Sequence, residues 1–126
     1  MKRFYIAIVL LIIIITTCFF VVDHLNKNTV AIKDEINKIR DAVAAENQSD
    51  ADAAMKHLIS HWEEEKYLFH ALAGSNYCDP FESVLDRSKV WLEKKEADDL
   101  FVELSELYSR IDQLWDTQAI HPKNLF

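Results

Sequence analysis

The sequence is poor in the two residue types that most often interrupt helices. Its 126 residues include one glycine, Gly74, and two prolines, Pro80 and Pro122. Glycine and proline supply the backbone conformations of tight turns, and both are unfavourable inside helices. A sheet with many tight turns is therefore excluded, and the sequence predicts an all-α fold of long helices.

Cysteine is also scarce, and Cys18 and Cys78 are the only two in the chain. Because Cys18 lies within a long apolar run, a disulfide framework holding a small domain together is excluded. We interpret Cys78 as a small apolar contact, with an exposed single thiol as the alternative.

The short motifs of common catalytic sites are absent as well. The chain has no nucleophile elbow, no Gly-rich phosphate loop and no CxxC pair. With a single glycine, a backbone cradle for phosphate is not expected. We therefore predict no catalytic residues and no cofactor, and we expect that the protein is not an enzyme.

What the sequence does contain is one long apolar segment near its start. Residues 4–22 read FYIAIVLLIIIITTCFFVV and include no charged residue. At about 1.5 Å per residue, a helix of this length comes close to the roughly 30 Å hydrocarbon core of a bilayer. The sequence therefore predicts a transmembrane signal-anchor helix over residues 1–22 and a separate helical domain over residues 23–126.

A cleaved signal peptide is the alternative interpretation of this segment. Such peptides have an apolar core of about 7–15 residues that ends at small residues. This run is longer and ends in the bulky stretch Phe19–Val22, which favours a retained anchor. Cys18 does not match a lipidated cysteine either, because Thr17 stands where glycine or alanine is expected.

Flanking charge predicts the orientation of the anchor. Lys2 and Arg3 precede the apolar run, whereas Asp23 follows it. Basic residues beside a first membrane helix tend to stay in the cytoplasm. We therefore expect a single-pass protein of the cell membrane with its N-terminus in the cytoplasm and its domain outside.

Acidic residues outnumber basic ones in the predicted domain. Residues 23–126 contain 12 Lys and Arg, because Lys2 and Arg3 precede the run, and all 21 Asp and Glu, which gives a net charge of −9. A domain of this charge is not expected to bind nucleic acid or an anionic membrane surface. We interpret the charge as a solvated acidic surface, with a basic partner or divalent cations as alternatives.

Apolar residues recur at helical spacing throughout the domain. A stalk helix continues from the apolar run, and a second helix spans about 50–73 after a Ser49 cap. A third helix starts at Asp79 with Pro80, and a fourth starts near Ala97. Short connections predict an antiparallel four-helix bundle made of two helical hairpins, residues 23–73 and 79–118. The predicted apolar positions are Leu25, Thr29, Ile32, Ile36, Ile39, Val43, then Ala51, Met55, Leu58, Trp62, Phe69, Leu72, then Phe81, Val84, Leu85, Ser88, Trp91, Leu92, and then Leu100, Phe101, Leu104, Leu107, Tyr108, Ile111, Leu114 and Trp115.

One tryptophan falls on the apolar side of each of the last three helices. We interpret Trp62, Trp91 and Trp115 as core residues whose indole N–H groups need hydrogen-bond partners. A ligand-binding aromatic box is the alternative, although helical spacing alone explains the pattern.

The one constellation with metal-ligand spacing lies on the second helix. His57 and His61 are four residues apart and share a face, with Glu64 and Glu65 about one turn further on. Two imidazoles and a carboxylate can hold zinc or a similar ion. However, a zincin helix requires glutamate directly after the first histidine, and Leu58 occupies that position. We therefore predict surface histidines and no metal, with these four residues as the alternative metal ligands.

Several stretches resemble a family of short bacterial proteins of unknown function. They are the MKRFYIAIVLL opening, the DADAAMKHLISHWEE block, the helix over residues 104–115 and the HPKNLF ending. The resemblance covers the whole chain and implies one N-terminal membrane helix followed by a helical bundle, in Gram-positive and often spore-forming bacteria. It also implies a multi-pass membrane protein encoded nearby, and it assigns no catalytic residue.

These observations lead to two functional expectations. The first is a membrane-anchored accessory or interaction module at the outer face of a bacterial membrane, which binds a membrane protein or itself. The second is an extracytoplasmic sensor or a metal- or ligand-binding bundle, including a metal-dependent enzyme built on His57 and His61. In an up-and-down bundle the tail, residues 121–126, is expected to return to the membrane side.

Overall fold

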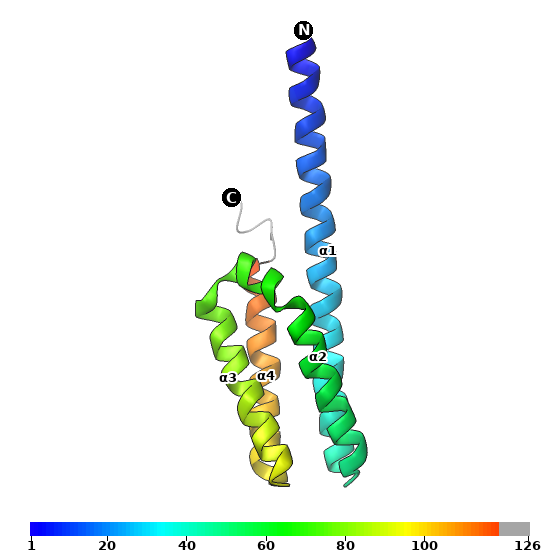
Figure 1. Cartoon of the computed structure of the whole chain (residues 1–126), viewed down its shortest axis with the longest axis vertical. Helices are drawn as coiled ribbons and strands as arrows, with labels where there is room; N and C mark the ends of the chain where they lie inside the picture. The colour runs from blue at the N-terminus through cyan, green and yellow to red at the C-terminus, as the bar shows by residue number, and fades with distance from the viewer. Residues whose placement is uncertain (119–126) are drawn as a thin grey trace.

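The computed structural model describes the backbone of residues 1–118 and the side chains of residues 1–114, and this part of the chain is helical. The four helices are α1 (Lys2–Ala44), α2 (Gln48–Ala73), α3 (Ser75–Glu93) and α4 (Ala97–Gln118). Successive helices run in opposite directions and pack side by side as a bundle, while α1 extends far beyond it (Figure 1). The predicted all-α four-helix bundle is confirmed.

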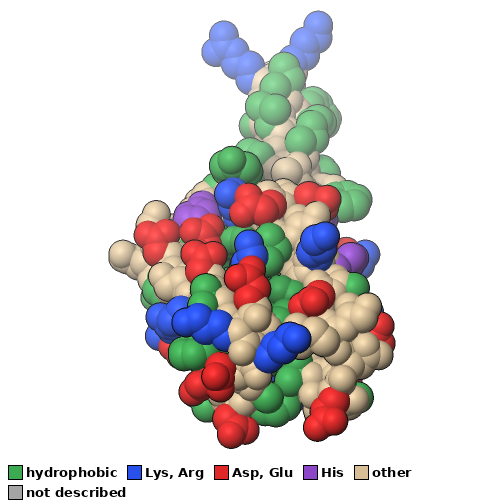
Figure 2. Space-filling model, turned by 60° about the horizontal axis from the view of Figure 1, so that its bottom comes forward, with side chains coloured by type: hydrophobic (Ala, Val, Ile, Leu, Met, Phe, Trp, Pro, Cys, Tyr) green, Lys and Arg blue, Asp and Glu red, His purple; other side chains and the backbone are tan. Residues whose placement is uncertain are grey.

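The first helix continues without interruption from an exposed segment into the bundle. Residues 1–20 of α1 are exposed, whereas the helix is buried against the bundle from Leu25 onward. Its first part forms an apolar neck with basic side chains at the far tip (Figure 2). Within the described residues, α1 is the one helix long and apolar enough to cross a membrane.

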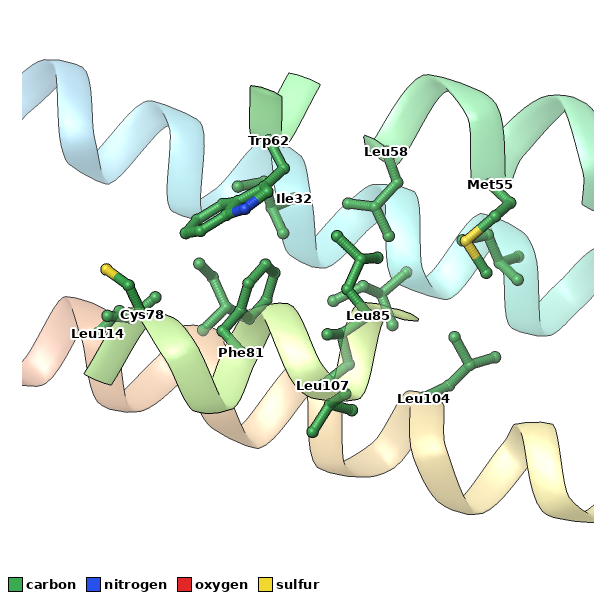
Figure 3. Close-up of a cluster of buried hydrophobic side chains, with 14 of the residues drawn as sticks. Ile32, Met55, Leu58, Trp62, Cys78, Phe81, Leu85, Leu104, Leu107 and Leu114 are labelled. Carbon is green, nitrogen blue, oxygen red and sulfur yellow. The ribbon is translucent and has the colours of Figure 1, made fainter. Parts of the chain in front are cut away.

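The core follows the predicted apolar positions closely (Figure 3). Ile32, Leu58, Phe81 and Leu104 are among the side chains with no exposed surface. Trp62 is buried as predicted, while Trp91 is half-buried and the side chain of Trp115 lies outside the described residues. The buried residues of the core are Leu25, Ile32, Ile36, Ile39, Ala51, Met55, Leu58, Trp62, Phe69, Cys78, Phe81, Val84, Leu85, Leu92, Leu100, Leu104, Leu107, Ile111 and Leu114.

One predicted apolar position is exposed in the structure, and another is buried with a hydroxyl left unpaired within the described residues. Leu72, near the end of α2, is 49% exposed, although its neighbour Ala73 packs against the core. Thr29 is buried, but its hydroxyl has no hydrogen-bond partner among the described side chains. The hydroxyl therefore adds a cost of desolvation at a position where a purely apolar side chain would have none.

The start of α2 differs by two residues from the prediction. Asn47, rather than Ser49, caps the helix, and its side-chain oxygen accepts a hydrogen bond from the backbone N–H of Asp50 at 3.1 Å. Asn47 Nδ2 also donates to the Asp50 carboxylate at 2.7 Å. Glu46 precedes the cap with a φ of 58°, which turns the chain between α1 and α2.

The start of α3 was also predicted wrongly. The expected loop over residues 75–78 is helical, α3 begins at Ser75, and Pro80 lies inside the helix. Gly74, with a φ of 82°, separates α2 from α3. Its carbonyl accepts hydrogen bonds from the N–H groups of Tyr77 and Cys78, and the buried Cys78 side chain holds this first turn against the core.

The topology places the ends of α2 and α4 at the same end of the bundle as the point where α1 enters it (Figure 1). Lys33 of α1 forms an ion pair with Asp112 of α4, which links the first helix to the last. The predicted up-and-down arrangement is therefore confirmed. The predicted position of the tail, residues 121–126, lies outside the described residues.

Candidate functional site

A buried carboxylate lies between α1 and α2. Glu35 is 6% exposed, one residue before the buried Ile36. Its Oε1 atom lies 2.9 Å from His57 Nδ1 and 3.0 Å from His61 Nδ1. A buried carboxylate is tolerated only when it is hydrogen-bonded or paired with a positive charge, and these histidines provide both.

The His61 ring is held by partners on both of its nitrogens. Nδ1 faces the Glu35 carboxylate, and Nε2 lies 2.8 Å from Asn28 Oδ1. The Asn28 amide is oriented because its Nδ2 donates to the His24 carbonyl at 3.0 Å. Both ring nitrogens of His61 therefore have an oxygen partner. The arrangement pairs an imidazole with a buried carboxylate. We call Glu35, Asn28, His57 and His61 the Glu35 cluster.

The structure brings only part of the predicted metal set together. His57 and His61 share one face of α2, as predicted, and both contact Glu35. Glu65 lies 3.0 Å from His24 instead. Glu64 is exposed and forms no ion pair among the described side chains. The carboxylate between the two histidines thus comes from α1, and sequence analysis missed it. The position of Glu35 could have indicated its burial, because it lies one helical turn from both Ile32 and Ile39 on the buried face of α1.

A second cluster lies between α2 and α3, nearer the end of the bundle where α1 enters. Glu82 Oε1 accepts a hydrogen bond from Trp62 Nε1 at 3.1 Å and lies 3.3 Å from His70 Nε2. The Asp79 carboxylate is close to both Glu82 and His70. We call Glu82, Trp62, His70 and Asp79 the Glu82 cluster. The predicted hydrogen-bond partner of the Trp62 indole is therefore a carboxylate.

Aromatic packing fixes the position of this second cluster. The Trp62 ring lies 5.4 Å from Phe69 and 4.4 Å from Phe81, measured between ring centroids. Because Phe81 precedes Glu82 on α3, the same contact that packs the helices also sets the height of the carboxylate. Sequence analysis did not identify this cluster, since nothing in the spacing of His70 and Asp79 shows that they come together across two helices.

Charged neighbours influence two further groups here. Burial raises the pKa of the Cys78 thiol to about 11, and the negative charges of Glu82 and Asp79 add to this effect. Cys78 is therefore a neutral, buried contact, which agrees with its predicted role. A hydrogen bond to Glu63 at 2.6 Å raises the pKa of Lys66.

Shallow grooves follow the junction between α2 and α3. One of about 500 Å³ has an apolar floor of Met55, Ile59 and Leu92. Its rim is charged and is formed by Asp52, Lys56, Lys89 and Glu93. The groove is open to solvent and lies away from both histidine clusters.

The fold and these clusters define a small helical bundle that carries a long apolar N-terminal helix. Residues 19–125 match the family described as "Domain of unknown function (DUF4363)". The chain belongs to this family, which bears out the resemblance to a family of unknown function. No curated protein and no solved structure matches the chain.

Proposed function

We propose that this protein is a membrane-anchored, non-enzymatic interaction module, with the bundle at the outer face of a bacterial membrane and a multi-pass membrane protein as its partner. The observation that carries the proposal is the continuity of α1. A single helix of 43 residues contains both the exposed apolar segment and a buried face of the bundle. An uninterrupted helix holds the bundle at a fixed height and rotation relative to the bilayer.

This rigid connection favours binding to another membrane protein. A module that acts on soluble targets gains reach from a flexible linker, whereas a fixed geometry favours a partner held in the same membrane. The acidic surface, visible as many red side chains over the bundle in Figure 2, is consistent with a partner that presents basic loops.

Co-purification tests the proposed partnership. Full-length protein is isolated in mild detergent and compared with a variant whose residues 4–22 are replaced by an unrelated membrane helix. We expect a multi-pass membrane protein to be recovered with the native chain. Recovery of no partner, together with a strictly monomeric state, would contradict the proposal.

The orientation is tested separately with protease added to intact, wall-stripped cells. The flanking charges Lys2 and Arg3 support a cytoplasmic N-terminus, so we expect the bundle to be removed from intact cells. Full protection until lysis would show that the bundle is cytoplasmic.

A second candidate function is an extracytoplasmic sensor or ligand-binding bundle. The observation that favours it is the Glu35 cluster, in which His57 is largely exposed while Glu35 is buried. A small ligand or cation entering there would exchange partners with the two histidines. Calorimetry on the full chain and on a His57→Gln, His61→Gln variant tests this function, and binding that both proteins share would exclude this cluster as the site.

A further inference from the structure

Three side chains with metal-binding atoms converge where the end of α2 meets the start of α3. His70, Asp79 and Glu82 each contribute one ligand atom, and these atoms all lie within 4.8 Å of one another. Asp79 and Glu82 are three residues apart on α3 and share a side of that helix. The Trp62–Phe81 contact sets the register between the two helices.

The negative charges of this cluster are only partly balanced by basic side chains, because Lys66 interacts electrostatically with Glu82 without forming an ion pair with it. Within residues 1–114, no Lys or Arg pairs with Asp79 or Glu82, and His70 is the one ion-pair partner of Glu82. The nearby Lys66 pairs with Glu63 instead. Two neighbouring carboxylates repel each other when both are ionised, and a bound cation removes that repulsion.

The separation of two of the ligand atoms fits a shared ion, and all three lie within 4.8 Å of one another. Zinc lies about 2.0–2.2 Å from imidazole nitrogen and carboxylate oxygen, so two ligands at 90–110° are about 3.0–3.5 Å apart. The measured separation of His70 Nε2 and Glu82 Oε1 is 3.3 Å. Asp79 is exposed, so its side chain is free to adjust its position when an ion binds.

One ligand, Glu82, is held in place by a side chain that is not itself a metal ligand. Trp62 is 1% exposed, and its indole N–H donates to Glu82 Oε1 at 3.1 Å. Such a hydrogen bond from a surrounding residue fixes the orientation of a ligating carboxylate and is a common feature of metal sites.

We propose that His70, Asp79 and Glu82 form a site for a divalent transition-metal ion of the zinc class. One imidazole nitrogen and two carboxylate oxygens suit such ions, whereas Mg²⁺ and Ca²⁺ prefer ligand sets made of oxygen alone. Three protein ligands leave one tetrahedral position for water or for a group from another molecule. The ion would join α2 to α3, and the inference does not depend on the proposed membrane partner.

Calorimetry with untagged, full-length protein in detergent micelles tests the site. The protein is first treated with a chelator and dialysed, and then titrated with zinc chloride and, separately, with magnesium chloride. We expect one zinc ion per chain at micromolar protein concentration and no comparable binding of magnesium. Asp79→Asn should weaken zinc binding at least about tenfold, because it removes a charged ligand.

The controls separate loss of a ligand from loss of structure or of general charge. Asp79 is exposed, so its replacement leaves the core intact, and circular dichroism checks that helicity is unchanged. Glu82→Gln keeps an oxygen that accepts the Trp62 hydrogen bond and should also weaken zinc binding. Asp86→Asn makes the same charge change at an exposed position on the same helix and should leave binding unchanged.

Three results would overturn the proposal. The first is that the wild-type protein does not bind zinc. The second is that the Asp79→Asn and Glu82→Gln proteins bind zinc with the same affinity as wild type. The third is that zinc binding is lost only in the double variant with His57→Gln and His61→Gln. The last result would assign zinc to the Glu35 cluster. None of them depends on whether a membrane partner is recovered.

Discussion

Glu35 shows how a single residue joins two helices. Its carboxylate is almost fully buried, and His57 and His61 from α2 are its partners. When one member of a buried, hydrogen-bonded pair is removed, the other stays buried without a partner for its polar group. The resulting loss of stability is larger than the net stability that the pair contributes. The stability of the α1–α2 hairpin therefore depends on both members being present.

The first prediction tests that dependence with a double-mutant cycle. Glu35→Ala should lower the free energy of unfolding by about 1–3 kcal/mol, because His61 keeps its place without its acceptor. Replacing Glu35 and His61 together with leucine should recover part or all of the loss. Urea denaturation followed by circular dichroism measures both values.

Asp34→Ala, at an exposed neighbouring position, is the control and should change stability by less than about 0.5 kcal/mol. If the losses of Glu35→Leu and His61→Leu, measured separately, add up to the loss in the double-leucine variant, Glu35 and His61 are not coupled.

The second prediction concerns Cys78, whose pKa is raised to about 11 from 9.0, chiefly by burial. The folded protein keeps the thiol proton more tightly than the unfolded chain does. The stability from the neutral thiol is therefore fully present below pH 9 and is lost as pH rises through about 11. The Cys78→Ala variant has no thiol and does not lose stability in this way. The difference in free energy of unfolding between wild type and Cys78→Ala should therefore shrink by about 2 kcal/mol over that pH range.

Urea denaturation of both proteins at several pH values, in the presence of a chelator, measures the difference. The comparison with Cys78→Ala removes the contributions of lysine and tyrosine residues, which ionise in the same range in both proteins. A constant difference between the two proteins from pH 8 to 11 would show that the thiol pKa is not raised.

Residue roles were predictable from the sequence where helical spacing determines them. Trp62 and Cys78 were expected in the core, and both are buried. The partners of Glu35 and Glu82 were not predictable, because each contact joins residues 12 or more positions apart on different helices. Spacing along one helix carries no information about the rotation and register of its neighbour.

At the scale of elements, the ends of the helices are less predictable than their existence. Periodicity along each segment predicted all four helices, since burial of an apolar stripe is what stabilises them. Asp79 and Pro80 together are a strong local start signal, yet α3 begins at Ser75. The preceding turn is helical because Cys78 is buried against the core, and this packing compensates for the backbone hydrogen bond that Pro80 cannot donate.

The third prediction distinguishes the observed cap of α2 from the one that the sequence indicated. Asn47→Ala removes the acceptor for the Asp50 N–H and should cost about 1 kcal/mol. Ser49→Ala makes a similar truncation inside the first turn and should cost no more than about 0.5 kcal/mol. Thermal or urea unfolding of the two variants measures the order. A larger loss for Ser49→Ala would show that the helix starts where the sequence first indicated.

At the scale of the whole molecule, α1 determines what the bundle can do. The Glu35 cluster lies between α1 and α2, which pack side by side, whereas the Glu82 cluster lies between α2 and α3, at the end of the bundle toward the apolar segment of α1 (Figure 1). Because α1 is uninterrupted from Lys2 to Ala44, any rotation of its apolar part rotates the bundle by the same angle. The composition of the sequence predicted an anchor and a bundle. The absence of a break between them was indicated by the lack of glycine and proline in this region.

The fourth prediction uses the geometry of the α-helix to test whether this rigid connection matters for partner binding. Each added residue lengthens a helix by about 1.5 Å and rotates everything after it by about 100°. Two alanines inserted between Val22 and Asp23 therefore raise the bundle by about 3 Å and rotate it by about 200°. Four alanines raise it by about 6 Å but return it to within about 40° of its original direction.

If the partner contacts one face of a rigidly held bundle, rotation should matter more than height. We therefore expect the four-residue insertion to retain more of the co-purifying partner than the two-residue insertion, although it displaces the bundle further. Both variants should keep the helicity of the wild-type protein and most of its thermal stability, because the insertion precedes the first fully buried residue, Leu25, and displaces only the half-buried Val21 from the core. Equal recovery with both insertions would show that the connection between membrane and bundle is flexible. A progressive loss with insertion length would show that height above the membrane, rather than rotation, governs the contact.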